Sequence, residues 1–360
     1  MRIRPRFHWL ALLLAYPGIL AAQPAADSGK KNEPHKPTRL FRSREPITMW
    51  LTADFKAVNK DTDTLSTKKY PAKMRYLGEK GDTVSLDVEL GTRGHFRLRT
   101  CKFVPLKVYF NEEQTKNGPF AGEKSLKLGT HCSNEDRMVQ NTYIEYAINR
   151  MYNILTPLSL KARLANVTYI DPANPKFTVT QPGIWYQDDE DLAKEFRGKI
   201  VMQQGGSTSA MEPHQQAITD LFQYMIGNTD MGMTVLHNYR IVTMDTSSAW
   251  FAFAYDFDWA GLVDAPYAAP DQKLQDRYGI HYVTERLFRG ISCYPEDIVA
   301  GTINLFRARK DSLYAALSTL NGLKPERAKK ATDYLDGFYK KLDDPKQVKK
   351  VLEFNDPCKP

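Results

Sequence analysis

Alternating apolar and polar positions dominate the first half of the chain. Such alternation, interrupted by turns that contain Gly, Pro or Asp, is typical of β-strands with one buried face. The strands that this pattern predicts cover residues 48–55, 72–76, 83–90, 95–99, 106–110, 125–128, 163–170, 177–179 and 184–186. One helix interrupts them, because apolar residues recur at helical spacing from Met138 to Leu155.

Helical periodicity dominates the second half. The predicted helices cover residues 188–197, 213–226, 284–288, 296–310, 311–320 and 325–342. One β-hairpin, with strands at 239–242 and 250–255, is expected among them. The sequence therefore predicts an α+β protein with a β-rich half and a helical half that meet near Gln187.

The N-terminus has the pattern of a secretory signal peptide. Three Arg residues precede an apolar run from Trp9 to Leu20, and small residues lead to a cleavage site after Ala22. We expect residues 1–22 to be a signal peptide and residues 23–45 to be a flexible linker. The protein would then be exported, either periplasmic or secreted, with no transmembrane segment left after cleavage. An uncleaved membrane anchor is the alternative, disfavoured because the apolar run is short for a span.

The hydrophobic content and net charge of the chain indicate a folded protein and argue against one class of partner, nucleic acids. Hydrophobic residues make up 42% of the 360 residues, which is enough for a packed core. The net charge of +8 falls to about +5 when the three Arg residues of the signal peptide are removed. Basic and acidic residues are interspersed, as on solvated helix faces, so a nucleic-acid partner is not expected.

Four cysteines in an exported chain allow two disulfides with three connectivities. Cys101–Cys132 is the favoured pair because each residue lies near the end of a predicted strand, and Cys293–Cys358 follows by elimination. CxxC and HExxH spacings are absent, so a zinc site is not expected.

The strongest chemical signal lies between Gly227 and Asp258. Asp230, Asn238, Asp256 and Asp258 surround the predicted hairpin, with Asp256 and Asp258 two residues apart and therefore expected on one strand face. Neighbouring carboxylates repel unless a cation lies between them, and two Asp with an Asn suit Mg²⁺ when phosphates complete the shell. Asp230 would be available to orient or deprotonate a hydroxyl. The alternative is that Asp256 and Asp258 cap the helix or turn that follows them, while Asn238 serves a turn.

Candidate cations lie in the β-rich half. Lys127 sits in a predicted strand and would pair with Glu145 of the predicted helix, or with a phosphate. A solvated edge Lys is the alternative, and Lys107 is a rival for the same role. Arg93 precedes a Gly and could approach a ligand at a tight bend. No P-loop or Rossmann motif occurs.

Five segments together resemble a known family. They are RGHFRLRTCKFVPLKVYF, KSLKLGTHC, QNTYIEYAINRMYNIL, IGNTDMGMTVLHNYRIV and AYDFDWAGLV. This chain is similar over about residues 46–295 to the spore-coat-protein-H-like (CotH-like) atypical kinases, in particular to their exported Gram-negative branch. The GNTD, HN and YDFD segments also resemble HipA-type kinases over a shorter stretch.

The resemblance implies a two-lobed protein-kinase-like fold, with a β-rich N-lobe at 46–187 that contains one helix and a helical C-lobe at 188–360 that contains a β-hairpin. It implies that Asp230 is catalytic and that Asn238, Asp256 and Asp258 hold Mg²⁺. Lys127, with Glu145, would position the ATP phosphates. Asp230 and Asn238 are 8 apart, against 5 in the protein-kinase pattern, and Asp258 replaces the usual Gly.

The expected function is phosphoryl transfer from ATP, with Mg²⁺, to a hydroxyl of a protein in the cell envelope. The main alternative is a catalytically silent kinase-fold module that binds a protein or a glycan, with the acidic cluster holding a structural Ca²⁺. A metal-assisted hydrolase is less favoured, because no second set of metal ligands and no His base accompany these carboxylates.

Overall fold

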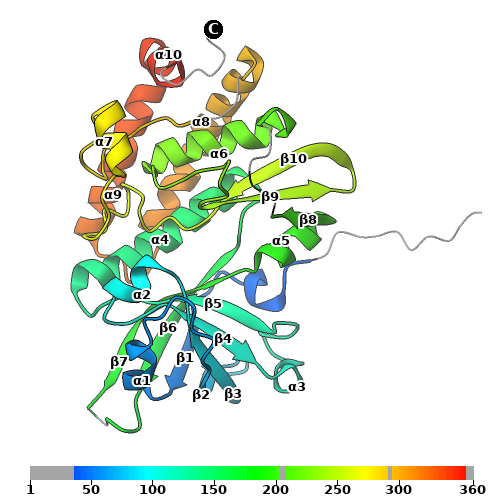
Figure 1. Ribbon diagram of the computed structural model, residues 1–360, viewed down its shortest axis with the longest axis vertical. Coiled ribbons are helices and arrows are strands. Elements are labelled where there is room, and N and C mark those ends of the chain that lie inside the picture. The colour runs from blue at the N-terminus through cyan, green and yellow to red at the C-terminus, as the bar shows by residue number, and fades with distance from the viewer. Residues whose placement is uncertain (1–35, 175, 203, 205–207, 291–293, 354–360) are drawn as a thin grey trace, which may run out of the picture. The chain divides into compact units, whose positions relative to one another are not determined.

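The computed structural model describes residues 36–174, 176–202, 204, 208–290 and 294–353 (Figure 1). The predicted signal peptide, the first part of the predicted linker and both members of the predicted Cys293–Cys358 pair lie outside these residues. The described residues belong to one compact unit.

Seven strands close into a barrel in the order β1-β2-β3-β4-β5-β7-β6. They are β1 (Ile47–Thr52), β2 (Tyr70–Leu77), β3 (Thr83–Thr92), β4 (Leu106–Phe110), β5 (Ser125–Gly129), β6 (Ala162–Ile170) and β7 (Thr178–Tyr186). All neighbours pair antiparallel except β1 and β6, which run parallel from Ile47 opposite Ala165 to Thr52 opposite Ile170.

The expectation of a two-lobed kinase-like fold is wrong. Such a fold has an open sheet in its N-lobe, whereas the parallel pairing of β1 with β6 closes the sheet of this protein into a mixed barrel. Alternation along each strand predicted the strands, but closure depends on which edges meet. Closure satisfies backbone groups that an open sheet would leave at its two edges.

The described helices are α1 (Phe55–Lys60), α2 (Phe96–Thr100), α3 (Glu112–Thr115), α4 (Asp136–Leu155), α5 (Asp189–Glu195), α6 (Pro213–Ile226), α7 (Gln272–Tyr278), α8 (Glu296–Ser318), α9 (Pro325–Leu342) and α10 (Pro345–Glu353). Two 3₁₀ turns, η1 (Arg39–Arg42) and η2 (Thr208–Ala210), accompany them. A separate sheet has the order β10-β9-β8, from β8 (Gly198–Val201), β9 (Tyr239–Met244) and β10 (Ser247–Ala254).

Several predicted elements differ from the observed ones. The strand expected at 95–99 is the short helix α2, and the helix expected at 284–288 is irregular. The two short strands expected before Gln187 are one strand, β7, which continues through Pro182. At Pro182, β7 pairs with β6 alone, because β5 pairs with β7 only from Ile184 onward, and a strand with one free side can accommodate a proline.

Two apolar clusters form the main cores. One fills the barrel around Met49, Leu106 and Trp185. The other joins α6, α8 and α9 to the β9–β10 hairpin and includes the C-terminal half of α4. Figure 1 shows α4 running beside these helices, and α4 also contacts β6 and β7. Helix α4 therefore links the barrel to the helical core, and the polar residues on it lie where the two meet.

Candidate functional site

A cavity of about 590 Å³ contains seven of the eight residues that the sequence singled out. Its lining comprises Arg93, Gly94, His95, Phe96, Arg97, Pro105, Lys127, Glu145, Asn149, Leu160, Tyr186, Asp230, His237, Asn238, Arg240, Tyr255, Asp256, Asp258 and Trp259. Lys107 is not among them, since its Nζ lies over the Tyr109 ring, 5.3 Å from the centroid. Residues from the barrel, α4 and the β9–β10 hairpin thus share one polar cavity.

The loop that carries Asp230 begins at a tightly packed helix end. Helix α6 ends at Gly227, whose φ of 67° is left-handed. A Cβ atom at this position would lie 1.9 Å from the hydroxyl oxygen of Tyr334, so a larger residue would both strain the backbone and displace Tyr334. Asn228 then accepts a hydrogen bond from the Asp230 backbone N–H at 3.0 Å. These constraints fix the start of the loop and direct Asp230 to the cavity.

The Asp230 carboxylate is held by two neighbours. Its Oδ1 lies 2.9 Å from His237 Nε2, and its Oδ2 accepts from Asn238 Nδ2 at 3.0 Å. Asn238 Nδ2 also donates to the Asp230 backbone carbonyl at 2.7 Å. Because both amide protons of Asn238 point to Asp230, its carbonyl oxygen Oδ1 remains available to a ligand. The sequence assigned no chemistry to His237, which the structure places as a partner of Asp230.

Asn238 and Asp256 both have left-handed backbone conformations, with φ of 55° and 60°. Residues other than glycine rarely adopt this region, although Asn and Asp do so more readily than most. The two flank the hairpin where β9 begins and β10 has ended, and the Tyr255 N–H donates to the Asn238 carbonyl at 3.1 Å. Non-glycine residues in this region cluster at functional sites, where the surroundings enforce the conformation.

Asp256 and Asp258 do not share a strand face, contrary to the expectation. Strand β10 ends at Ala254, and the left-handed turn at Asp256 breaks the alternation. Asp256 is exposed and Asp258 is only 6% exposed, yet both line the cavity. The pair comes together through the turn and not through strand periodicity.

Asp258 is a buried carboxyl in an unfavourable position for a charge. Burial raises its pKa well above the usual range, and the charges of Asp256 and Glu145 raise it further. Arg97 and a hydrogen bond of 2.9 Å from the Tyr267 hydroxyl to Oδ2 only partly offset these effects. Tyr267 leaves Asp258 Oδ1 available, so a cation in the cavity would relieve the repulsion.

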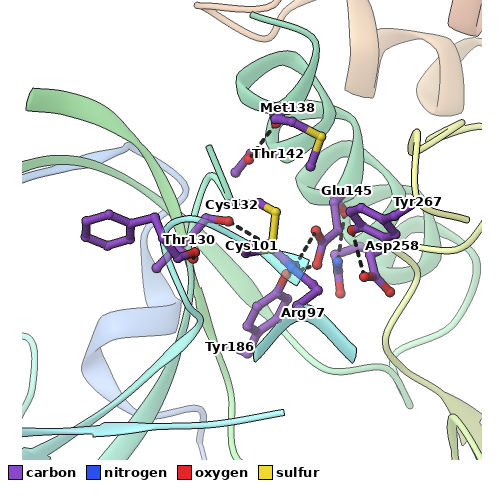
Figure 2. Close-up of polar contacts among 12 residues, drawn as sticks. Arg97, Cys101, Thr130, Cys132, Met138, Thr142, Glu145, Tyr186, Asp258 and Tyr267 are labelled. Atoms are coloured by element: carbon purple, nitrogen blue, oxygen red, sulfur yellow. Dashed lines mark hydrogen bonds and ion pairs between the residues drawn. A yellow bond between two sulfur atoms is a disulfide. The ribbon is translucent and has the colours of Figure 1, made fainter. Parts of the chain in front are cut away.

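Arg97 replaces Lys127 as the partner of Glu145, so the predicted Lys127–Glu145 pair is wrong. Arg97 Nη1 lies 3.4 Å from Glu145 Oε2, Nη2 donates to the Thr130 carbonyl at 2.6 Å, and the Tyr186 hydroxyl donates to Glu145 Oε1. Figure 2 shows Arg97, Glu145 and Tyr186 gathered beside Asp258 and Tyr267. The side chains of the pair are 14% and 8% exposed, so the ion pair is nearly buried.

The buried pair has unusual titration behaviour. Burial raises the pKa of Glu145, although the Arg97 guanidinium opposes the shift. Burial alone would lower the pKa of Arg97, but Tyr267, Glu145 and Asp258 together raise it above its ordinary value. Arg97 therefore remains charged, and two of the five guanidinium N–H donors are used by Glu145 and Thr130.

Lys127 instead pairs with Asp189 at the N-terminus of α5. Lys127 Nζ lies 2.9 Å from Asp189 Oδ1, and Arg240 Nε lies 2.7 Å from Asp189 Oδ2. Burial would raise the pKa of Asp189, but these two cations lower it below its usual range. Arg240 also stacks on the Tyr255 ring at 4.3 Å. Asp189 thereby holds two cations at the edge of the cavity.

The donor set can be tested against Mg²⁺. Two carboxylates and one amide oxygen at Asp256, Asp258 and Asn238 are hard oxygen ligands, and Mg²⁺ usually completes such partial sets with water and substrate phosphates. Within the described ranges, no group of three His, Cys, Asp or Glu residues could hold a metal ion by itself. The residues fit a Mg²⁺ ion shared with a ligand better than a closed protein cage.

The predicted Cys101–Cys132 disulfide is present, with a Cα–Cα distance of 4.6 Å (Figure 2). Among the residues that the structure describes, no helix is both long enough and apolar enough to cross a membrane.

Comparison of the chain with models of protein families and with curated proteins finds no match. The resemblance to CotH-like and HipA-type kinases therefore stays a prediction.

The sequence analysis did not single out the cavity residues Arg97 and Arg240, nor Tyr267, which donates to Asp258. Arg97 was hidden because residues 95–99 alternate like a strand, and Arg240 because it lies within a real strand. Tyr267 lies in a segment with little periodicity. The only available signal was the density of basic residues in RGHFRLR, which marks a cationic segment without stating what it faces.

Proposed function

We propose that the cavity binds a Mg²⁺–nucleotide complex, with ATP as the first candidate, and that the protein transfers the terminal phosphoryl group to a hydroxyl. The observation that carries the proposal is the side-by-side arrangement of a carboxylate pair and several cations in one cavity. Phosphoryl transfer is catalysed mainly by positioning and by neutralising charge, and these residue types are suited to both.

Each group has a distinct part in the proposed reaction. Asn238, Asp256 and Asp258 would hold Mg²⁺, which when bound neutralises phosphate charge. Arg97 keeps unused guanidinium donors and would bind phosphate oxygens, a role that the sequence assigned to Lys127. Lys127, Arg240 and Arg93 add positive charge along the cavity wall.

Asp230 would orient the acceptor hydroxyl. Its carboxylate is fixed through His237 and Asn238 and is 35% exposed, so an incoming hydroxyl has access to it. A positioned carboxylate of this kind accepts the hydroxyl proton as the new bond forms. The acceptor class that we propose is a protein of the cell envelope.

Export is part of the proposal. The N-terminal signal-peptide pattern and the Cys101–Cys132 disulfide both favour an oxidising compartment, either the periplasm or the exterior. Peptide mapping of secreted material, with the N-terminus determined, tests this point. Cleavage after residue 22 with a bridged Cys101 supports export, and an intact N-terminus with free thiols contradicts it.

The decisive experiment measures thermal stability and phosphoryl transfer with ATP, with and without Mg²⁺. Binding at a hundredfold excess over Kd adds about 2.7 kcal/mol to the free energy of unfolding. Asp256→Asn should weaken Mg²⁺-dependent binding and abolish transfer, because one charge of the metal site is lost.

Asp245→Asn is the matched control. Asp245 lies in the turn of the same hairpin but does not line the cavity, so binding should be unchanged. If the wild type shows no Mg²⁺-dependent nucleotide binding, the enzyme proposal fails, and a catalytically silent module that binds a protein or glycan becomes the better account.

A further inference from the structure

We propose that the Cys101–Cys132 disulfide positions Arg97 in the phosphate-binding part of the cavity, so that full nucleotide affinity requires the oxidised protein. The proposal rests on the proposed function and adds to it a dependence on redox state. It makes Cys101 and Cys132 positioning residues that act through Arg97.

The residues concerned form a strap, residues 93–103, which connects β3 to β4 and carries α2. At its start the Arg93 N–H donates to the Pro105 carbonyl at 3.1 Å. At its end the Phe103 N–H donates to the Cys132 carbonyl at 2.8 Å, and the Phe103 carbonyl accepts from Thr130 Oγ1 at 3.0 Å. Both ends of the strap are thus fixed, and the ligand-facing residues lie between them.

Residues 130–132 hold both the strap and Arg97. Thr130 supplies the carbonyl that accepts from Arg97 Nη2 at 2.6 Å, and Cys132, two residues later, is bonded to Cys101 at the C-terminal end of α2. Cys132 has a φ of 62°, a conformation that non-glycine residues keep only where the surroundings enforce it. The disulfide and the hydrogen bond from Arg97 to the Thr130 carbonyl therefore connect residues 97–101 to residues 130–132 at two points.

Noncovalent packing is limited in α2, although Phe103 at the end of the strap is buried. Of the α2 residues, only Leu98 is fully buried, Arg99 and Thr100 are exposed, and Phe96 is exposed although its ring contacts Trp259 and Tyr267. Gly94, at a φ of 93°, has no neighbouring heavy atom near the position of a Cβ. Segments with few buried apolar contacts open locally at low free energy. Without the crosslink, α2 should open more often, and each opening withdraws Arg97 from Glu145 and from the cavity.

The redox step is a thiol–disulfide exchange. A dithiol reductant donates two electrons and two protons, the S–S bond breaks, two cysteine thiols form, and the dithiol becomes its own disulfide. The buried Glu145 then loses its cation, and the phosphate site loses a charged donor.

The experiment measures affinity for Mg²⁺ with a non-hydrolysable ATP analogue by calorimetry, using oxidised and dithiothreitol-reduced protein. Reduction should weaken binding by about ten- to a hundredfold, the range expected when a hydrogen bond from a charged group is lost. The Cys101→Ser/Cys132→Ser variant should match the reduced protein and should not respond to dithiothreitol.

The same measurement in an Arg97→Ala background separates positioning from general structural support. Arg97→Ala should lose about the same factor as reduction, and reduction of Arg97→Ala should then change affinity little. Equal weakening of the wild type and of Arg97→Ala by reduction would overturn the proposal, because the disulfide would then act without Arg97. Unchanged affinity of the reduced wild type would overturn it as well.

Hydrogen exchange without nucleotide provides a readout that does not depend on the proposed function. Reduction should accelerate exchange of amides in residues 94–101 and leave α4 and the β9–β10 hairpin protected. Strap exchange that does not respond to reduction contradicts the positioning role. If the oxidised wild type binds no nucleotide but reduction still accelerates hydrogen exchange in the strap, the proposed function fails. The positioning of the strap by the disulfide is then still supported.

Discussion

The two walls of the cavity are built in different ways. The acidic wall, formed by Asp230, Asn238, Asp256 and Asp258, comes from one hairpin and the residues that flank it. The cationic wall consists of Arg93, Arg97, Lys127 and Arg240, which belong to the strap, β5 and β9. The acidic wall is therefore local in sequence, and the cationic wall is assembled from distant segments.

Different interactions hold the two walls. Local backbone geometry places the acidic residues, through the left-handed conformations of Asn238 and Asp256 and the hydrogen bonds between Asp230 and Asn238. Long-range ion pairs place the cations: Arg97 with Glu145 is 48 residues apart, and Lys127 with Asp189 is 62 residues apart. A substitution in the acidic wall should therefore mainly lower the rate of phosphoryl transfer. A substitution in the cationic wall should mainly lower the free energy of unfolding.

The largest expected effect is on turnover, at the acidic wall. Asp230→Asn should lower the rate of phosphoryl transfer by about 10²- to 10⁴-fold, because the proton acceptor for the hydroxyl is lost. Nucleotide affinity should stay nearly unchanged, since the proposed role of Asp230 is toward the acceptor. Single-turnover kinetics with calorimetry checks both quantities, with Asp245→Asn as control. Turnover equal to that of the wild type would remove Asp230 from the mechanism.

The largest expected effect on stability is at the cationic wall. Arg97→Ala leaves Glu145 buried without a cation and should lower the free energy of unfolding by about 3–5 kcal/mol. Urea unfolding measures this, and Glu145→Gln in the same background should restore part of the loss. Lys127→Ala is the matched comparison, because Asp189 keeps Arg240, and should change stability by about 1 kcal/mol or less. Equal losses in both variants would contradict the difference between these ion pairs.

A smaller effect should appear in the pH dependence of stability. Because the pKa of Asp258 is raised in the folded state, the native protein binds more protons than the unfolded chain above about pH 4. The free energy of unfolding of the metal-free protein should therefore fall as pH rises toward the folded pKa. Asp258→Asn should flatten this slope by up to about 1.4 kcal/mol per pH unit.

Urea unfolding across the acidic and neutral range in a chelator tests this effect. Glu145 contributes in the same direction, since its pKa is also raised, so some slope should remain in the variant. A variant with the full slope of the wild type would show that Asp258 is not the carboxyl responsible.

The smallest effect is expected outside both walls. Lys107→Ala removes a cation over the Tyr109 ring and should change the free energy of unfolding by less than about 1 kcal/mol. Nucleotide affinity should not change, because Lys107 does not line the cavity. Calorimetry measures the nucleotide affinity of this variant. A weaker affinity than that of the wild type would show that Lys107 belongs to the cationic wall.

The sequence by itself determined the elements with strong periodicity and the local chemistry. It predicted β4 and α6 within their observed bounds, the hairpin that carries the acidic wall and the Cys101–Cys132 bridge. These features depend on interactions between residues close in the chain, or on a covalent chemistry that few residues can provide. Periodicity, capping and turn residues encode such features directly.

Only the tertiary structure decided the closure of the barrel and the partners of the buried charges. The alternation of residues 95–99 predicted a strand, but packing against residues 130–132 makes the segment a helix and turns Arg97 toward Glu145. Which cation pairs with a buried carboxylate such as Glu145 depends on the free energy of desolvating both charges at that position. That buried position forms only when β1 pairs with β6 and α4 packs against the barrel.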